Sequence, residues 1–354
     1  MTAPRLAAAA EVAAGLLAPL QGRAIHVSGG TGFLASNLLA LLHAASEAGD
    51  LGLRLHASAR GVGGARPDLP LFAFYGIEPD IAWQAASVEA TRLPDEPGLV
   101  VVHAASFGAP ADYLREPVAT FRANTDGLLG LYAQAAALGA AHVVFFSSAE
   151  VYGQPPAEAL PTPEGFGGGP ALGTPRSIYG EAKRMGEVLG ASQAAATGIP
   201  FTAVRPFNLF GPGQRPGDGR VPLAFARMAL EDRTIVLHGD GRPRRSPCAV
   251  LDGMLQIAAC LAPDPRRPVR AYNIGDPTGE TSMADLARRC AAAAGLDDDA
   301  VELGGAQDGA PARAVPDVRA VLQLAGGGWM PAFSAPDAAL AELIDWLQWT
   351  AVRA

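Results

Sequence analysis

The sequence predicts an α/β protein built on a Rossmann-type, doubly wound parallel sheet with a smaller C-terminal α/β domain. Three observations carry this prediction. Short, almost wholly apolar runs alternate with helical patterns through the first half, as in parallel sheets that are covered on both faces. A glycine-rich turn follows the first apolar run and opens a helix. After residue 207 the alternation gives way to Gly/Pro-rich loops and shorter elements.

The first 206 residues contain five predicted strands. Each is a short run of mainly apolar residues, and the runs cover residues 24–29, 53–58, 99–106, 142–148 and 201–206. Helical patterns lie between several of them, over residues 32–48, 117–138 and 178–197. Because parallel strands need long crossover connections, the alternation favours a parallel sheet that is buried on both faces.

The N-terminal segment 6–20 has the apolar character of a signal peptide. Glu11 interrupts the apolar run, however, and a strand begins almost at once at Ala24. We therefore expect a short helix that covers an edge of the first domain. No run of about 18 apolar residues predicts a membrane span.

The second half contains smaller elements. A Gly/Pro loop covers 211–220, strands are predicted at 234–241 and 271–276, helices are predicted at 221–231, 249–262, 281–294 and 337–350, and 296–336 is loop-rich. We expect residues 1–206, with a returning segment near 234–265, to form the larger domain. Residues 207–233 and 266–354 are expected to form the smaller one.

The composition excludes several classes of function. The 354 residues are 49% hydrophobic and 18% charged, which is typical of a globular chain. With a net charge of -8 and no block of basic residues, neither nucleic acid nor an anionic membrane is an expected partner. Cys248, Cys260 and Cys290 are far apart, and the histidines show no metal-binding spacing, so we expect no metal site and a reduced, cytoplasmic setting.

A glycine-rich turn follows the first strand, with Gly29, Gly32 and Ala35 in the spacing GxxGxxA. Such spacing permits a tight turn, a close approach of the backbone to a pyrophosphate, and close packing of helix on strand. The helix N-terminus then attracts the pyrophosphate. A plain strand–turn–helix is the alternative, but the position at the first strand of an alternating chain favours a dinucleotide site.

The end of the second strand bears on the choice of dinucleotide. NAD enzymes usually carry a ribose-binding carboxylate there, whereas this chain has Ala59 and Arg60. Arg60 either pairs with a 2′-phosphate, which would favour NADP, or is a solvated surface arginine. The cofactor is therefore expected to be NAD or NADP.

A YxxxK motif places Tyr179 and Lys183 on one face of a predicted helix. A lysine beside a tyrosine is expected to lower the pKa of the phenol, because the cation favours phenolate. The tyrosine can then act as a general base toward a hydroxyl while hydride leaves the same carbon. The alternative is that both residues lie on an exposed helix face. A predicted strand that ends at Ser148 about thirty residues earlier argues against it, because this is the order expected of a Ser–Tyr–Lys triad.

Many ordered motifs accompany this pair. They are GGTGFLAS from Gly29, HAAS (103–106), RANTDG (122–127), SSAEVYG, YGEAK, RPFNLFGPG (205–213), DGRV (218–221), HGDGRPRRS (238–246) and YNIGD (272–276). From about residue 22 to about 290 the chain resembles the extended short-chain dehydrogenase/reductases of the nucleotide-sugar epimerase/dehydratase superfamily. The resemblance implies a tightly bound dinucleotide, a nucleotide-sugar substrate held by the smaller domain, and a homodimer.

The resemblance also implies roles for individual residues. Ser148 matches the hydroxyl that binds the sugar, Tyr179 the base and Lys183 its partner, with Glu150 as a further acid. The matches to cofactor contacts are Gly29, Gly32, Phe33, Leu34, Ala104, Ala105, Asn124 and Pro206. The matches to substrate contacts are Asn208, Arg220, Val221 and Arg245. Asn208 can instead cap a turn, and Arg245 can be one surface arginine among three.

Ala149 bears on the reaction. In the 4,6-dehydratases that the chain resembles, the matching position holds an aspartate that protonates the departing hydroxyl, so Ala149 argues against such a dehydratase. Residues 103–118, 174–187 and the DGRV motif are most similar to UDP-glucuronate decarboxylases. Departures are Ala59, the Ser87-Val88 pair where Asp-hydrophobic is common, and a missing aromatic residue after Arg245.

Three hypotheses follow. The first is a C4-oxidising nucleotide-sugar decarboxylase, the second a nucleotide-sugar 4-epimerase or related reductase, and the third a non-catalytic NADP-binding regulatory protein. The helices at 117–138 and 178–197 are those that pair across the dimers of the superfamily. On them, Leu128, Leu131, Val188 and Leu189 serve either that interface or the core.

Overall fold

The computed structural model describes residues 3–61, 67–304, 313–324 and 336–353. At its centre lies a seven-stranded sheet in which every neighbouring pair of strands is parallel. Its strands are β1 (Ala24–Ser28), β2 (Arg54–Ala59), β3 (Ile81–Ala85), β4 (Val100–His103), β5 (His142–Phe146), β6 (Phe201–Pro206) and β11 (Val269–Ile274). The predicted fold class is confirmed.

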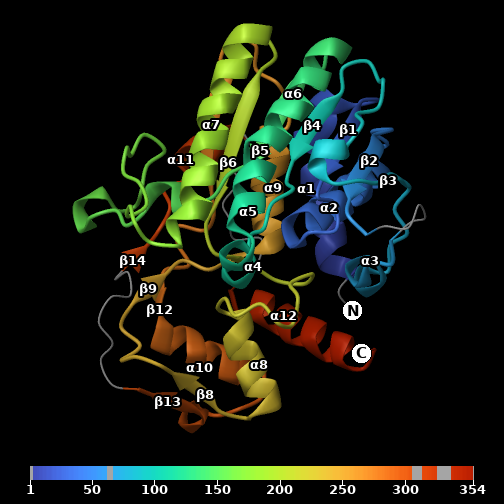
Figure 1. The fold of residues 1–354 in the computed structure, drawn as a ribbon. Coiled ribbons are helices and arrows are strands. Elements are labelled where there is room, and N and C mark those ends of the chain that lie inside the picture. Colours follow the sequence, from blue (N-terminus) through green and yellow to red (C-terminus); the bar gives the residue numbers. More distant parts are fainter. Residues whose placement is uncertain (1–2, 62–66, 305–312, 325–335, 354) are drawn as a thin grey trace.

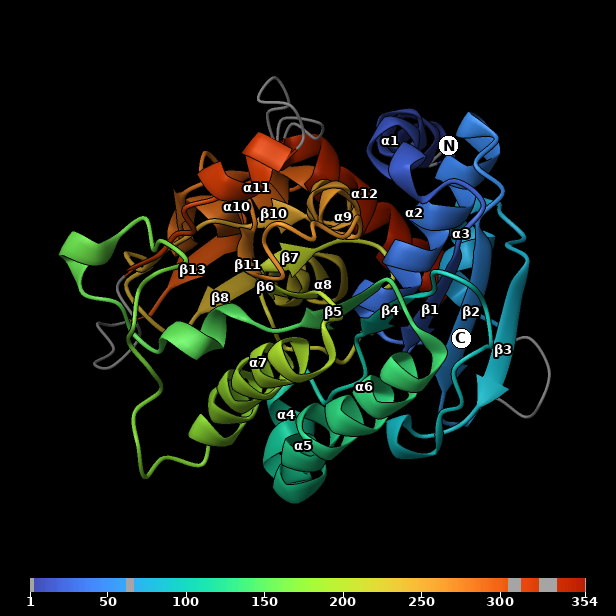
Figure 2. The same cartoon turned by 90° about the horizontal axis from the view of Figure 1, so that it is seen from above.

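Helices cover both faces of this sheet (Figure 2). One face carries α1 (Ala3–Leu17), α2 (Phe33–Gly49) and α9 (Val250–Cys260), and the other carries α5 (Pro117–Asn124), α6 (Asp126–Leu138) and α7 (Ser177–Thr197). β1, β4 and β5 are buried along their whole length. That burial on both faces explains why their sequences are almost continuously apolar.

The strand order is β11-β6-β5-β4-β1-β2-β3. The chain winds outward from β1 in one direction and from β4 in the other, so the order reverses between these two strands. In open parallel sheets, ligands bind outside the carboxyl ends of the strands at this reversal. The glycine-rich turn that follows β1 and the Ala104–Ala105 turn that follows β4 both lie there.

The smaller part lies beyond the carboxyl ends of the sheet (Figure 1). It contains α8 (Leu223–Glu231), α10 (Met283–Ala293), the pair β8 (Ile235–Leu237) and β13 (Val301–Leu303), and β9 (Arg244–Arg245) between β12 (Thr281–Ser282) and β14 (Arg313–Ala314). α12 (Pro336–Ala351) packs against α8 and α10 and against α3 (Pro70–Tyr75) of the larger part. β7 (Leu209–Phe210) and β10 (Cys248–Ala249) pair between the two parts.

Two segments differ from the predicted division of the chain. β11 extends the central sheet beside β6, so residues 269–274 lie in the larger part although they were expected in the smaller one. β8 pairs with β13, so residues 235–237 lie in the smaller part and not with the returning segment. Later in the same predicted segment, α9 packs against α1 and α2.

Several elements differ from the predicted ones. The helix predicted over 117–138 is interrupted at Thr125 and forms α5 and α6. α3, α4 (Pro110–Arg115) and β3 were not predicted, and β4 is shorter than the apolar run 99–106. In the loop-rich region 296–336 the structure contains β13, β14 and α11 (Arg319–Leu324), while 305–312 and 325–335 lie outside the described residues.

The N-terminal helix is present as α1, which packs on α2 and α9 and so covers a face of the molecule rather than a sheet edge. Arg5 anchors it to the C-terminal helix by an ion pair of 3.1 Å with the buried Glu342. Within the described residues, no helix combines the length and apolar character needed to cross a bilayer.

Candidate active site

The glycine-rich turn after β1 is shaped by two close approaches. Gly29 has a φ of +75°, and a Cβ added there would lie 2.6 Å from the Cα of Ala105. A Cβ on Gly30 would lie 2.9 Å from the ring of Trp83. Glycine at position 29 therefore permits this turn to lie against the segment that follows β4, and glycine at position 30 leaves room for the Trp83 ring of β3.

The helix that follows this turn offers an anion site. Gly32 is the N-cap of α2, and no side chain caps the helix, so the first-turn N–H groups at Phe33 and Leu34 face outward without an intrahelical acceptor. Such amides bind phosphate oxygens. The turn, the helix N-terminus and Ala104–Ala105 form a cradle that fits the pyrophosphate of a dinucleotide.

The end of β2 carries no carboxylate, as expected. The exposed guanidinium of Arg60 lies 4.7 Å from the centre of the Phe107 ring, in the loop after β4. Arg60 therefore stacks on the neighbouring loop rather than extending freely into solvent. Asn124 is fully buried; its Nδ2 donates to Ser106 Oγ at 2.9 Å, and its Oδ1 has no hydrogen-bond partner among the described residues.

The predicted triad comes together where β5 ends and α7 begins. Tyr179 is hydrogen-bonded to Ser148, and the Tyr179 ring stacks on Tyr113 at a centroid distance of 5.0 Å. Lys183 is 2% exposed, and its Nζ donates to the carbonyl of Phe146 at 2.6 Å. This lysine is the only one in the sequence. The arrangement brings a hydroxyl, a phenol and an amine to one end of the sheet.

The ionisation of the tyrosine differs from the sequence prediction. Burial raises the pKa of Tyr179 to about 12, although the hydrogen bond from Ser148 and the charge of Arg220 oppose the rise. Burial also lowers the pKa of Lys183 to about 7, against the opposing charge of Glu187. The amine lies 5.6 Å from the centre of the Tyr179 ring and bonds to a carbonyl. Desolvation is therefore stronger than the expected effect of the lysine charge.

Charged side chains surround the phenol on the side of the smaller part. Ser148 Oγ accepts from Glu150 N at 3.2 Å and caps a 3₁₀ turn (Ala149–Tyr152), which leaves Glu150 exposed. The Glu150 carboxylate acts electrostatically on Tyr179 and on Arg245 of β9. Arg220 acts on Tyr179 as well, and its guanidinium pairs with Asp218 at 2.5 Å.

The remaining predicted substrate contacts lie on connections between the two parts. Pro206 ends β6, and Asn208 has a left-handed φ of +48° two residues later. The carbonyl of Asn208 accepts from Cys248 N at 3.2 Å, and its side chain is exposed. Val221 lies next to Arg220, shortly before α8. Asn208 thus holds a turn through its backbone while its side chain is free to bind a ligand.

Sequence reasoning missed two residues of this site. Tyr113, on α4, stacks on Tyr179 and is hydrogen-bonded to Arg176, which directly precedes α7. Both residues fall in the segments that were singled out by resemblance, 103–118 and 174–187, yet neither was named. Their proximity depends on how α4 packs beside α7, which a linear motif does not reveal.

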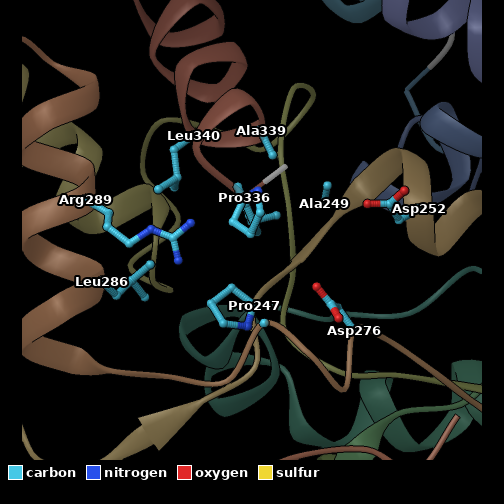
Figure 3. Close-up of a pocket in the computed structure, with 11 residues that line it drawn as sticks. Pro247, Ala249, Asp252, Asp276, Leu286, Arg289, Pro336, Ala339 and Leu340 are labelled. Carbon is cyan, nitrogen blue, oxygen red and sulfur yellow. The ribbon is translucent and has the colours of Figure 1, made fainter. Parts of the chain in front are cut away.

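A small cavity lies elsewhere, between α9, α10 and α12 (Figure 3). Its volume is about 10 Å³, enough for about one water molecule, and the carboxylates of Asp252 and Asp276 lie beside it. None of the predicted site residues lines it. In the described part of the chain no cluster of three metal-binding side chains occurs, and all three cysteines are buried and unpaired.

Comparison with known proteins agrees with the motifs. The sequence pattern of the NAD dependent epimerase/dehydratase family matches residues 25–275. The chain is 32% identical over 231 residues to UDP-glucuronic acid decarboxylase 1 of Xenopus tropicalis, and the aligned region covers 65% of this chain and 52% of that protein. It is 33% identical over 187 residues to UDP-glucuronic acid decarboxylase 5 of Arabidopsis thaliana, which covers 53% of each chain. The chain thus spans about half the length of these curated relatives.

Solved structures share the fold over almost the whole chain. UDP-glucose 4-epimerase of Thermotoga maritima, solved with UDP-glucose, aligns with a TM-score of 0.73 at 22% identity, covering 93% of this chain and 99% of that one. UDP-N-acetylglucosamine 4-epimerase of Methanobrevibacter ruminantium aligns with a TM-score of 0.75 at 19% identity, covering 92% and 98%. At such identities the similarity establishes the fold.

Proposed function

The chain belongs to the NAD dependent epimerase/dehydratase family, and we propose that it oxidises a nucleotide sugar transiently at C4 and decarboxylates it, as a UDP-glucuronate decarboxylase does. The charge around Tyr179 carries this proposal. Arg176, Arg220 and Arg245 outnumber the carboxylates Glu150 and Asp218 there. A site with excess positive charge favours a substrate that carries a carboxylate besides its diphosphate.

The residues divide the work as follows. Ser148 hydrogen-bonds the C4 hydroxyl, and Tyr179 accepts its proton. The glycine turn and the start of α2 would hold the dinucleotide, which when bound would supply the acceptor for the C4 hydride and the source of its return. With C4 a ketone, the C5–C6 bond breaks, CO2 leaves, and the electron pair enters the enolate of the C4 carbonyl. C5 is then protonated, and reduction of C4 yields a nucleotide pentose.

Arg176 is proposed to bind the sugar carboxylate. It is the arginine that is hydrogen-bonded to Tyr113, whose ring lies on the catalytic phenol. An arginine fork binds two carboxylate oxygens at once. The nucleotide diphosphate is proposed to bind to Arg220, Val221, Asn208 and Arg245. The dinucleotide is proposed to bind to the larger part, at β1 to β6 and α2.

The direct test is incubation of the purified protein with UDP-glucuronate. We expect CO2 and a UDP-pentose in equal amounts, and Arg176→Ala should weaken UDP-glucuronate binding about tenfold while leaving the affinity for UDP-glucose unchanged. Absence of CO2 would refute the decarboxylase. If UDP-glucose or another neutral sugar nucleotide were instead converted to its C4 epimer, the second hypothesis would replace it.

Cofactor identity is the next part of the proposal. We propose that the chain retains NAD or NADP through its catalytic cycle, because hydride must return to the same sugar. Arg60 stacks on Phe107 at the ribose end and is the group available for a 2′-phosphate. Mass spectrometry of the purified protein is expected to find co-purified dinucleotide. Arg60→Ala should weaken NADP binding but not NAD binding if Arg60 reads the phosphate.

A homodimer is proposed from exposed apolar side chains on α4, α5 and α7, three helices that lie beside one another (Figure 1). Five large side chains on these helices are 40–63% exposed: Leu114, Val118, Phe121, Met185 and Val188. Of the residues named from the sequence, Leu128 and Leu131 are buried in the core and Val188 is exposed. Several exposed apolar side chains on neighbouring helices are typical of an interface.

Light scattering should therefore give twice the mass of one 36.2 kDa chain. A charge at the centre of the surface, Val188→Asp, is expected to produce monomers, because a carboxylate would be buried without a partner. The control is Val236→Asp, which alters a side chain of similar exposure on β8 and should leave the mass unchanged. A monomeric wild-type protein would contradict the proposal.

A further inference from the structure

A partly buried ion pair lies next to the catalytic residues. Arg205, near the end of β6, donates from Nε to Glu187 Oε1 at 2.9 Å and from Nη2 to Glu187 Oε2 at 2.5 Å. The two side chains are only 12% and 16% exposed. Ser147, the neighbour of Ser148, donates from Oγ to the same Oε1 at 2.5 Å. Glu187 thus joins the catalytic helix to the ends of β5 and β6.

The pair continues into a wider polar network. Arg205 Nη1 donates to the hydroxyl of Tyr152 at 2.6 Å, and that hydroxyl donates to Asn273 Oδ1 at 2.6 Å. Asn273 lies on β11 and also binds the carbonyls of Thr162 and Asp317. The carboxyl ends of three neighbouring strands are therefore tied to α7 through one carboxylate. Such a network restricts the positions of the residues beside it.

Glu187 is also one helical turn from the catalytic lysine. Lys183 and Glu187 are four residues apart on α7 and share a face. The other titratable groups around the amine are Tyr179 on α7, Arg205 on β6 and His103 on β4. Burial holds His103 neutral, with a pKa of about 3, and Arg205 is already paired. Glu187 is the carboxylate whose charge opposes the loss of the lysine proton.

We propose that Glu187 is a positioning residue for catalysis: it favours the charged form of the Lys183 amine and fixes the chain at the end of β5, next to Ser148. The proposal rests on the role given above to Tyr179 and Lys183. An ion pair that only connects α7 to β6 would stabilise the fold without changing the pKa of the Lys183 amine. The two possibilities differ in what happens to the titration of Lys183 when the charge of Glu187 is removed.

The single lysine makes this titration directly measurable. Protein grown with lysine labelled with ¹³C at Cε gives one lysine resonance, whose shift against pH reports Lys183 alone. Glu187→Gln keeps the size and the acceptor oxygen of the side chain but removes its charge. We expect the titration midpoint of Lys183 to fall by about one pH unit. The assay needs no substrate, so it stands apart from the decarboxylation test.

Glu181→Gln is the matched control. Glu181 carries the same charge on the same helix but lies two residues from Lys183, on a different face, where it pairs with Arg184 at 3.6 Å. Its replacement should leave the midpoint unchanged. Glu187→Asp keeps the negative charge but moves it farther from Lys183, so it should lower the titration midpoint by less. This variant replaces Glu187→Gln in the test if the Gln variant does not fold. An unchanged midpoint in a folded Glu187 variant would overturn the proposal.

Turnover gives a second readout. If UDP-glucuronate is the substrate, Glu187→Gln should lower kcat about tenfold with little change in KM, because the carboxylate touches neither ligand. A shifted lysine midpoint in a protein that releases no CO2 would leave Glu187 in its role and refute the proposed reaction alone. An unshifted midpoint with normal CO2 release would refute Glu187 alone.

Discussion

Replacing Tyr179 by phenylalanine is expected to lower kcat on UDP-glucuronate by about three orders of magnitude, the scale of a lost general base. The change removes one oxygen and keeps the ring, so the stacking on Tyr113 at 5.0 Å should persist. Ser148 would remain to bind the sugar hydroxyl, but the phenol that is proposed to accept its proton would be gone. Single-turnover measurement of dinucleotide reduction at its ultraviolet absorbance would locate the loss in the oxidation step.

Two tyrosine variants separate this effect from a general loss of structure. Tyr113→Phe keeps the stacked ring but removes the hydroxyl bonded to Arg176, so it should raise KM for UDP-glucuronate more than it lowers kcat. Tyr272→Phe removes a hydroxyl that accepts from Arg267 away from the site and should change neither constant. Full biological function in Tyr179→Phe would instead favour the non-catalytic regulatory protein.

The central fold could be predicted from sequence because its signals are local. β1, β4 and β5 are apolar at nearly every position, since both of their faces are buried. β3 was missed because it is an edge strand whose exposed positions include Ala82 and Ala85, so no continuous apolar run marks it. The break at Thr125 was missed because no proline or glycine stands at that position to mark the end of a helix.

The placement of β11 shows a second limit. Residues 269–274 follow α9 and precede α10, and nothing in their sequence says which sheet they join. Their pairing with β6 is a tertiary fact that depends on α9 crossing back over the face of the sheet. β8 was expected with the larger part but lies in the smaller one. Its partner β13 could not be predicted, because β13 lies in a loop-rich region with weak sequence signals.

The site was predictable where motifs place residues at fixed spacing. Tyr179 and Lys183 are neighbours on one helix turn, and Ser148 lies two residues after the end of β5. Arg176 and Glu187 belong to the same helix region, but their partners Tyr113 and Arg205 come from distant segments. The pKa of Tyr179 was predicted in the wrong direction, because its burial is a property of the folded chain.

The pH dependence of kcat/KM is expected to follow from the Tyr179–Lys183 pair. The reactive form carries a phenolate and an ammonium, hence one proton on the two groups together. In the free protein Lys183 has a pKa of about 7 and Tyr179 a pKa of about 12. The pair therefore loses its first proton near pH 7 and keeps the second proton until the pH is far higher. Rates should rise about tenfold per pH unit below 7 and level off above it.

Lys183→Met is expected to remove this break. Without the amine, the only titration left is that of the phenol, whose pKa of about 12 lies above the accessible range, so log kcat/KM should climb steadily through neutral and alkaline pH from a level at least a hundredfold lower at pH 7. The sign follows from burial: desolvation lowers the pKa of the lysine and raises that of the tyrosine, which places the proton on the phenol in most molecules. The reactive form, in which the lysine holds the proton and the tyrosine is a phenolate, is therefore the minor one. The substrate must bind to this minor form or shift the pair toward it. A wild-type profile level from about pH 6 to 8, or a break near 7 that survives in Lys183→Met, would show that another group controls the rate.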